Sequence, residues 1–254
     1  MIDEPFDVFA ETYDWIHTFR GDIPFWIYQA KRNTGPVLEL GCGTGRTTWE
    51  IADAGVPIVG IDISMPMLQK AEAKRERYPN ASSVILKLAD MCDFNLGITF
   101  NTIIMPGQSF QYAITHEEQL KTFQMACAHL KKGGSFVIFT MAPPVEEDIS
   151  EGVEFLKKTL VSPNTGNNCR YYEKKKINHK QQTITTIGRL EEYDHNGKVI
   201  QESNYAPKTL RWSTARQLEK LGELTQLNVV ACFSDWLRRP YRTGDPFLIY
   251  AYEK

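Results

Sequence analysis

The sequence predicts an α/β fold: a doubly wound, seven-stranded, mostly parallel sheet with a small antiparallel β insertion after the fifth strand. Three observations lead to this fold class. Between residues 37 and 140, short β-rich runs alternate with longer helical patterns, as in parallel βαβ units. From residue 141 the chain changes to turn-rich and β-forming segments, and after residue 208 the alternation of helix and strand resumes.

The first two βα units are the most regular part of the chain. Residues 37–40 (VLEL) are typical of a strand, and a glycine-rich loop and a helix over about 44–54 follow, with Gly55 at the C-terminal cap. A second strand is expected at 57–62. Ser64 is a suitable N-cap for the next helix, whose apolar residues fall on one face.

Three more strands and a capped helix complete the parallel part of the predicted sheet. The strands are expected at 84–88, 102–105 and 136–140, the last after a glycine-containing turn. Thr115 begins the capping-box pattern T-x-x-E, which predicts a helix that continues to about residue 130.

Residues 141–208 are the predicted insertion. Two prolines at 143–144, an acidic run at 146–148 and the turn-rich stretch 162–168 interrupt the α/β pattern. Several β-forming stretches follow, and the tetrapeptide DHNG at 194–197 is a strong hairpin signal. A small antiparallel sheet is therefore expected, which we call the platform.

The remaining residues, 1–140 and 209–254, are expected to form one core. Thr214 begins a second capping pattern, T-x-x-Q, and predicts a helix. Strands are expected at 227–233 and 247–252, which brings the predicted sheet to seven strands.

The composition is that of an ordinary globular chain and excludes several classes of protein. The chain has 254 residues, 42% of them hydrophobic and 24% charged, which argues against fibrous and disordered chains. A formal net charge of −2 gives no general attraction for nucleic acid or anionic lipid. The start MIDEPF lacks the features of a signal peptide, and no run of about 18 apolar residues predicts a membrane span. Five cysteines without a CxxC pair favour neither disulfides nor zinc, and they fit a reducing cytoplasm. We expect a protein without a metal, either a monomer or a homodimer.

The segment ELGCGTGR, residues 39–46, carries the main functional signal. Gly41, Gly43 and Gly45 permit positive φ and remove Cβ atoms that would collide with a ligand. The N–H groups at the start of the following helix favour an anionic ligand group. A dinucleotide fingerprint, G-x-G-x-x-G, needs a third glycine where this chain has Arg46, so an NAD-linked oxidoreductase is disfavoured.

An acidic residue at the end of the second strand adds to this signal. Asp62 follows Gly45 by seventeen residues, and its carboxylate can accept both hydrogen bonds from a ribose diol. A nucleoside therefore fits the pattern. Taken together, Glu39, the G-x-G-x-G loop and Asp62 resemble the class I S-adenosylmethionine-dependent methyltransferases of the small-molecule type. The resemblance covers residues 37–140 motif by motif and extends more loosely to the F-A-x-x-Y-D segment at 9–14.

The resemblance implies that the chain binds S-adenosylmethionine and releases S-adenosylhomocysteine. It implies that Glu39 positions the methionine ammonium and that Asp62 holds the ribose hydroxyls. It also implies that Asp90 recognises the adenine amino group, that Met91 packs on the ring, and that Tyr13 closes over the cofactor. The residues implied to bind the cofactor are Tyr13, Glu39, Gly41, Cys42, Gly43, Gly45, Asp62, Ile63, Met67, Asp90, Met91 and Met105.

Some of these assignments have a purely structural alternative. Aspartate is also common as a loop residue that caps its own backbone, which is an equally simple role for Asp90. Methionine fills gaps in apolar cores, which suits Met91 and Met105. The loop gives Cys42 no adjacent base or metal partner, so its thiol is expected to be inert.

The methyl acceptor is expected opposite the end of the fourth strand. Residues 106–112 follow that strand, and Gln108, Tyr112 and Trp212 are candidate substrate-binding residues. The segment lacks the [D/N/S]-P-P-[Y/F/W] loop of nucleic-acid and protein amino-methyltransferases. In families that this chain resembles, an insertion after the fifth strand commonly forms a lid or substrate platform.

Methyl transfer from a sulfonium is an in-line displacement, so alignment and exclusion of water are its main requirements. A general base is optional. His17 and His116 are candidate proton acceptors near neutral pH, with packing and surface exposure as the respective alternatives.

A basic cluster in the insertion is a candidate site for binding RNA. Arg170, Lys174, Lys175, Lys176 and Lys180 lie beside two tyrosines, which is compatible with phosphate contacts and stacking. Residues 141–208 as a whole contain ten basic and ten acidic residues, so a solvated strand face is favoured over a nucleic-acid groove.

The sequence thus predicts an enzyme that methylates an O or N atom of a small molecule. An RNA or protein methyltransferase and a non-catalytic S-adenosylmethionine-binding protein remain as alternatives, because one fold hosts many activities.

Overall fold

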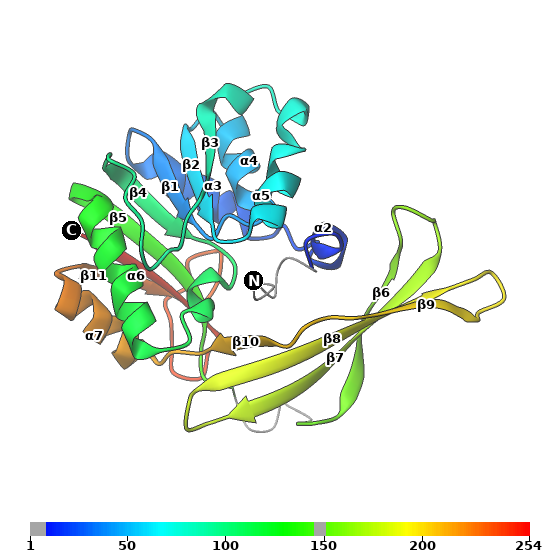
Figure 1. The fold of residues 1–254 in the computed structure, drawn as a ribbon. Coiled ribbons are helices and arrows are strands. Elements are labelled where there is room, and N and C mark those ends of the chain that lie inside the picture. Colours follow the sequence, from blue (N-terminus) through cyan, green and yellow to red (C-terminus); the bar gives the residue numbers. More distant parts are fainter. Residues whose placement is uncertain (1–8, 145–150) are drawn as a thin grey trace.

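The computed structural model of the chain describes residues 9–144 and 151–254. The opening MIDEPF and the acidic run at 146–148 lie outside the described residues. Figure 1 shows a seven-stranded sheet flanked by helices and, beside it, a five-stranded antiparallel sheet. The predicted fold class is confirmed.

The seven-stranded sheet has the order β11-β12-β5-β4-β1-β2-β3. Strands β3, β2, β1, β4 and β5 pair in parallel, whereas β12 is antiparallel to both β5 and β11. The direction of winding reverses between β1 and β4, which is where ligands bind in doubly wound sheets. The strands are β1 (Val37–Leu40), β2 (Ile58–Asp62), β3 (Val84–Leu88), β4 (Phe100–Met105), β5 (Leu130–Met141), β11 (Asn228–Phe233) and β12 (Phe247–Glu253).

Helices cover both faces of this sheet. One face carries α3 and α4 through a cluster that includes Trp26 and Trp49, and α5 lies beside α4, where the Trp49 indole N–H donates to the Ala71 carbonyl at 3.0 Å. The other face carries α6 and α7 through Phe123 and Leu221. The helices are α2 (Tyr13–Ile16), α3 (Ile23–Arg32), α4 (Arg46–Asp53), α5 (Met65–Glu72), α6 (His116–His129) and α7 (Ala215–Thr225), with short 3-10 turns at Arg75–Arg77, Ala81–Ser83 and Ser109–Tyr112.

Capping residues set where three of these helices begin. The Ser64 hydroxyl accepts from the Met67 N–H, and Thr115 forms a complete capping box with Glu118. Thr214 forms the same arrangement at the start of α7. Each cap satisfies N–H groups that the first helical turn leaves unpaired, so the predicted caps are confirmed.

β5 begins at Leu130, earlier than the predicted start at 136. The Gly133-Gly134 pair, read as a turn, lies within the strand instead. The β4–β5 pairing shifts register near Phe100, which accommodates the glycines, and the Gly133 N–H donates to the Lys254 carbonyl at 2.8 Å.

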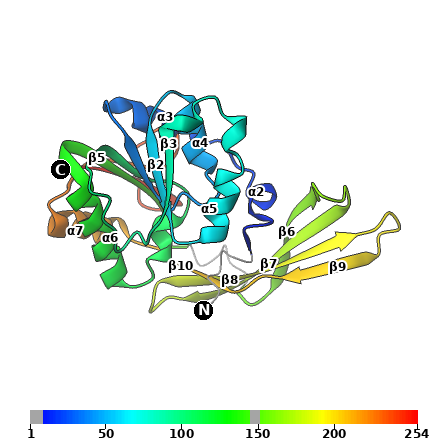
Figure 2. The ribbon, with the colours of Figure 1, turned by 45° about the horizontal axis from the view of Figure 1, so that its top comes forward.

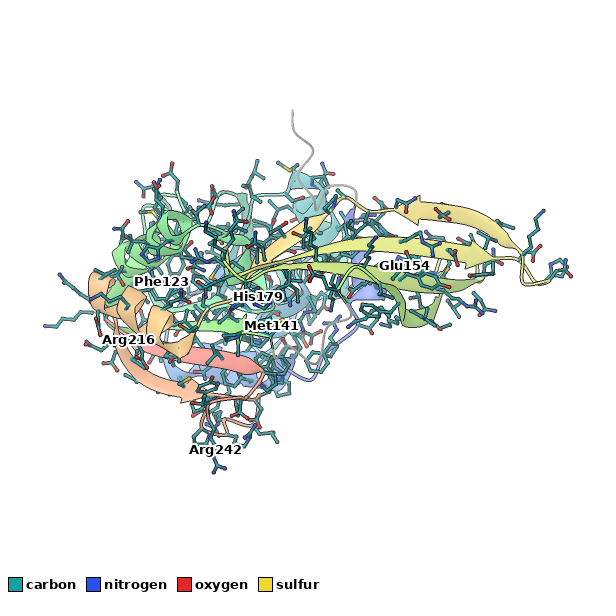
Figure 3. All side chains as sticks on the ribbon, turned by 90° about the horizontal axis from the view of Figure 1, so that it is seen from below. Phe123, Met141, Glu154, His179, Arg216 and Arg242 are labelled. Carbon is teal, nitrogen blue, oxygen red and sulfur yellow. The ribbon has the colours of Figure 1, made fainter. Side chains whose placement is uncertain are left out.

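The platform is the five-stranded antiparallel sheet, ordered β10-β8-β7-β6 with β9 paired to β8. The predicted turn at 194–197 joins β8 to β9, with Gly197 at a φ of 80°. Figure 2 shows the outer ends of these strands extending away from the core, and Figure 3 shows the platform from below, with His179 over the core and Glu154 toward the outer part. The strands are β6 (Glu154–Val161), β7 (Asn168–Asn178), β8 (Thr183–Tyr193), β9 (Val199–Asn204) and β10 (Lys208–Arg211).

A small apolar cluster joins the platform to the N-terminal segment. Phe9, which precedes α2, and Ile16, the last residue of α2, pack against Cys169, Tyr171 and Leu190 of the platform. This contact places α2 between the two sheets (Figure 1).

Core burial predicts that the same substitution, leucine to alanine, changes the free energy of unfolding by very different amounts at two positions. Leu221 is fully buried in the α6–α7 face, whereas Leu237 is 90% exposed. Leu221→Ala should lower the free energy of unfolding by about 2–5 kcal/mol, because it removes buried methyl groups and leaves a cavity. Leu237→Ala should change it by less than about 0.5 kcal/mol. Urea denaturation of both variants measures the difference, and equal effects would contradict the placement of α7.

Candidate active site

One large cavity, of about 1290 Å³, opens at the carboxyl ends of β1, β2 and β4. Its walls come from three parts of the chain that are distant in sequence. The core supplies the loops after these strands, the N-terminal segment supplies α2 and the residues after it, and the platform supplies the start of β10 and one residue of β6.

The glycine loop follows β1 and forms one wall of the cavity. Gly41, Gly43 and Gly45 all have positive φ, at 73°, 54° and 76°. A Cβ on Gly41 would lie 2.6 Å from the Ser109 hydroxyl oxygen, and one on Gly45 would lie 2.7 Å from the Trp49 ring. At Gly43 a Cβ would meet only open space, so this glycine keeps the backbone bare toward the cavity.

Asp62 lies directly against this loop. Its carboxylate accepts from the Gly43 N–H at 2.7 Å and from the Ser64 N–H at 3.0 Å. Both Gly43 and Asp62 line the cavity. The glycine loop and the acidic end of β2 therefore face the same space.

Glu39, in β1, is buried beside the loop and also lines the cavity. The Thr48 hydroxyl donates to its carboxylate at 2.6 Å. Burial raises the pKa of Glu39 to about 8, against the smaller lowering effects of the Thr48 hydrogen bond and Arg46. In the absence of a cationic ligand the carboxyl is therefore protonated at neutral pH.

Arg46 is a site residue whose role the sequence did not indicate. Its guanidinium donates two hydrogen bonds of 2.6 Å to the carboxylate of Asp22, which also accepts from the Trp26 indole N–H at 3.1 Å. The pair is nearly buried and both residues line the cavity. Its bidentate geometry fixes the segment after α2 to the start of α4.

A second polar contact ties α2 to the same loop. The Thr44 hydroxyl donates to Asp14 at 2.6 Å, and the Lys74 ammonium pairs with the same carboxylate at 2.6 Å. The glycine loop is thus held from the N-terminal segment as well as from β2.

The loop after β3 lines the cavity with Asp90 and Met91. Asp90 is exposed, and its carboxylate accepts from the Cys92 N–H at 2.8 Å, which is the self-capping geometry expected of a loop aspartate. Ile63 and Met67, at the end of β2 and in α5, also face this cavity, and Cys42 lines it from the glycine loop. Burial raises the pKa of the Cys42 thiol well above its usual value, so this thiol stays protonated.

Aromatic rings from α2 and the residues flanking it form another wall of the cavity. The rings of Tyr13 and His17 lie 4.6 Å apart, and Phe9 contacts both edge-on. Burial, together with the nearby Lys208 and Lys158, lowers the pKa of His17 to about 3. Its Nε2 atom is buried without a hydrogen-bond partner among the described residues. His17 is therefore a neutral ring at the cavity wall.

The segment after β4 contributes Gln108 and Tyr112 to the cavity. The Gln108 side-chain amide donates to the Met141 sulfur at 3.0 Å. Burial raises the pKa of Tyr112 well above its usual value, which keeps its hydroxyl protonated.

Four of the predicted site residues do not line the cavity. Met105 is completely buried in the core, and Gly45 serves as the N-cap of α4 behind the loop. His116 is exposed on the first turn of α6. Trp212 is buried at the end of β10, where its ring packs edge-on against His179. His116 thus lies at the surface and Trp212 in a packing contact, and both lie outside the residues that line the cavity.

The sequence also missed a group of cavity residues from distant segments. They share no motif, and only the tertiary arrangement brings them to the site. The additional residues are Thr18, Phe19, Lys121, Phe139, Lys158, Pro207, Lys208, Thr209, Trp236 and Phe247.

The described residues contain neither a cluster suited to a metal ion nor a helix suited to cross a membrane. Within residues 9–144 and 151–254, no cluster of three or more His, Cys, Asp or Glu side chains is arranged to hold a metal ion. Within the same residues, no helix has both the length and the apolar character needed to cross a membrane.

Sequence comparisons show what the central part of the cavity-forming chain is similar to. Residues 37–134 match a family of methyltransferase domains. The cypemycin N-terminal methyltransferase of a Streptomyces species is 35% identical over 100 residues, 39% of each chain. The dTDP-3-amino-3,6-dideoxy-alpha-D-glucopyranose N,N-dimethyltransferase of Streptomyces fradiae is 27% identical over 137 residues, 51% of each chain. The matched stretches therefore span about half or less of these relatives.

A solved structure extends the similarity in fold to nearly the whole chain. The CcbJ methyltransferase from Streptomyces caelestis superposes with a TM-score of 0.77 at 24% identity, covering 92% of this chain and 94% of that one. The comparisons agree with the predicted resemblance: residues 37–134 match a family model of methyltransferase domains, and the fold of the chain is that of a solved methyltransferase structure.

The raised pKa of Glu39 predicts how stability depends on pH. From the ordinary value of 4.5 up to about 8, the folded protein keeps a proton that the unfolded chain has released. Rising pH in this window should therefore destabilise the fold, by at most about 1.4 kcal/mol per pH unit from this group. Glu39→Gln removes this contribution, so its stability relative to the parent should increase with pH.

Urea unfolding at several pH values in this window measures the effect. Glu76→Gln is the control, because Glu76 is exposed on the surface. If the unfolding free energies of Glu39→Gln and the parent changed with pH in parallel, the result would contradict the raised pKa of Glu39.

Proposed function

We propose that this protein transfers a methyl group from S-adenosylmethionine to a small-molecule acceptor. The observation that carries the proposal is the hydrogen bond between the Gly43 N–H and the Asp62 carboxylate at the cavity wall. A bare backbone loop and a carboxylate suited to a ribose diol thus meet at one ligand-sized space. The methyltransferase-domain match over residues 37–134 supports the reaction class.

The residues around the cavity fit such a donor. The open space at Gly43 leaves room for a nucleoside against the loop, and Asp62 would hold its ribose hydroxyls. Glu39 would face the methionine ammonium, whose positive charge favours the ionised carboxylate. Asp90 and Met91 would contact the adenine. When bound, S-adenosylmethionine supplies a methyl group on a positively charged sulfur.

The cavity is large enough for donor and acceptor together, since about 300–1000 Å³ is usual for a single ligand. We place the acceptor between α2, the segment after β4 and the platform. Gln108 and Tyr112 would contact it from the core. The neutral His17 ring, with its unpaired Nε2, would accept a hydrogen bond from the acceptor N–H or O–H.

Positioning would supply most of the rate enhancement. Holding the acceptor in line with the donor methyl group is worth up to about 7–11 kcal/mol, whereas a general base typically contributes about 10²–10⁴-fold. With its pKa lowered to about 3, His17 is too weak a base to remove a proton before methyl transfer. Its role would be to orient the acceptor.

We assign residues 141–208 the role of an acceptor-binding platform on a core of residues 1–140 and 209–254. Three hydrogen bonds between the platform and the N-terminal segment support this assignment. The Lys158 ammonium donates to the Ile16 carbonyl at 3.0 Å and to the Thr18 hydroxyl at 2.7 Å, and the Tyr205 hydroxyl donates to the Thr12 hydroxyl at 2.9 Å. They fix the platform against the α2 segment at one side of the cavity.

The two Streptomyces relatives favour nitrogen as the methylated atom, whereas another relative, from Pseudescherichia vulneris, is named as an O-methyltransferase. The Streptomyces enzymes are named for methylation of a peptide N-terminus and of an amino sugar. A panel of small amines, amino sugars and matched hydroxyl compounds, incubated with the protein and methyl-labelled S-adenosylmethionine, tests the proposal. Label in a small amine is the expected result. Label only in added RNA or protein would refute the small-molecule assignment.

Asp62→Ala should weaken donor binding strongly. Loss of two charge-assisted hydrogen bonds to a ribose would cost about 3 kcal/mol, or about a hundredfold in affinity. Calorimetric titration with S-adenosylhomocysteine measures it. Asp53→Ala, at the exposed end of α4, is the matched control and should bind like the parent. Unchanged affinity in a folded Asp62→Ala variant would remove Asp62 from the site.

A further inference from the structure

Charge is distributed unevenly around the cavity. Among the described residues, the core side contributes six acidic residues to the lining and two basic ones. Of the basic residues, Arg46 is paired with Asp22 and Lys121 with Glu117. The acidic residues are Asp22, Glu39, Asp62, Asp90, Asp93 and Glu118. The platform side carries two lysines, Lys158 on β6 and Lys208 on β10, and no acidic residue of its described part, 151–208, lines the cavity. A ligand that spans the cavity therefore meets a mainly acidic lining at one end and two ammonium groups at the other.

The two lysines differ in what they contact. The Lys158 ammonium is held by the Ile16 carbonyl and the Thr18 hydroxyl. Lys208 forms no side-chain hydrogen bond or ion pair with any residue in the described ranges 9–144 and 151–254. Its ammonium lies 6.0 Å from the centre of the Phe9 ring, at the cavity wall.

Strand register explains why Lys208 faces the cavity. Lys208 pairs with Thr186 of β8, and in the antiparallel platform paired residues share a face. Thr186 pairs in turn with Lys175, which lies on the same face as Tyr171, the residue in contact with Phe9 and Ile16. This is the face turned toward α2. Lys198, in contrast, lies in the exposed turn between β8 and β9.

The nearest acidic group on this face does not neutralise Lys208. Glu173 is buried and attracts the Lys208 ammonium, but its carboxylate is paired with Lys175 at 3.7 Å. Burial lowers the pKa of Lys208, against this attraction. Removing an ammonium group from water raises the free energy of the folded protein unless an opposite charge lies beside it.

We propose that Lys208 binds an anionic group of the methyl acceptor, so that the acceptor is a small molecule bearing a carboxylate or a phosphate. The proposal rests on the proposed function and extends it to the class of substrate. The acceptor would be anchored at the platform by its anionic group, with its reactive atom directed toward the donor methyl group. An acceptor amine next to the acidic side and an anion next to Lys208 would match the charge distribution of the cavity.

Calorimetric titration of the protein saturated with S-adenosylhomocysteine tests this site, with inorganic phosphate and acetate as separate probes. The parent should bind at least one probe saturably. Lys208→Met should weaken that binding by about tenfold or more, because a charge-assisted contact is lost. Lys198→Met removes the same charge far from the cavity and should bind like the parent. Preference for phosphate or for acetate indicates which anionic group the acceptor carries.

Two further readouts separate this proposal from its alternatives. Lys208→Met should bind S-adenosylhomocysteine like the parent. Its melting temperature should equal or exceed that of the parent, since the change removes a partly buried charge that has no ion-pair partner among the described residues. Loss of S-adenosylhomocysteine binding in Lys208→Met would assign Lys208 to the donor carboxylate and overturn the proposal. Equal anion binding by Lys208→Met and the parent, or no saturable binding by the parent, would also overturn it. Failure of the parent to bind S-adenosylhomocysteine would instead refute the proposed function itself.

Discussion

The hydrogen bond from the Gly43 N–H to the Asp62 carboxylate is the constraint on which the rest of the site depends. It joins the ends of two adjacent parallel strands, where the Gly41 and Cys42 N–H groups also donate to the Ile61 carbonyl at 2.9 Å. With the loop fixed there, Gly45 is placed to begin α4 and Arg46 to reach Asp22. The loop, the helix start and the N-terminal segment are thus positioned by one local geometry at the reversal of strand order.

The sequence predicts this part of the molecule well because its signals are local. Strand, glycine loop and helix follow within residues 37–54, and Asp62 ends the next strand, so the parallel pairing of β1 and β2 is enough to bring Gly43 and Asp62 together. The caps at Ser64, Thr115 and Thr214 are equally local. Such patterns depend on neighbours in sequence, and the tertiary structure has little opportunity to override them.

The remaining walls of the cavity could not be predicted in this way. Lys158, Lys208 and Trp236 reach the site only because the platform folds back onto α2 and the C-terminal segment closes beside β5. Trp212 shows the converse: an aromatic residue next to β10 suggests a ligand contact, yet it packs against His179. The basic cluster at 174–176 likewise divides between two faces of β7, since successive strand residues point in opposite directions.

The electrostatics of the cavity bear on how methyl transfer would be favoured. A fully ionised acidic wall would stabilise the sulfonium of the bound donor at least as much as it stabilises the transition state. Such binding does not speed the chemical step. The negative charge of these carboxyl groups is already reduced or compensated. Asp62 accepts hydrogen bonds from two backbone N–H groups, and Glu39 is buried, with a pKa of about 8. They would recognise the ribose and the ammonium without concentrating negative charge at the sulfur. As the positive charge moves from sulfur toward the acceptor during transfer, an anionic group held at Lys208 would lie on the acceptor side, where that charge develops.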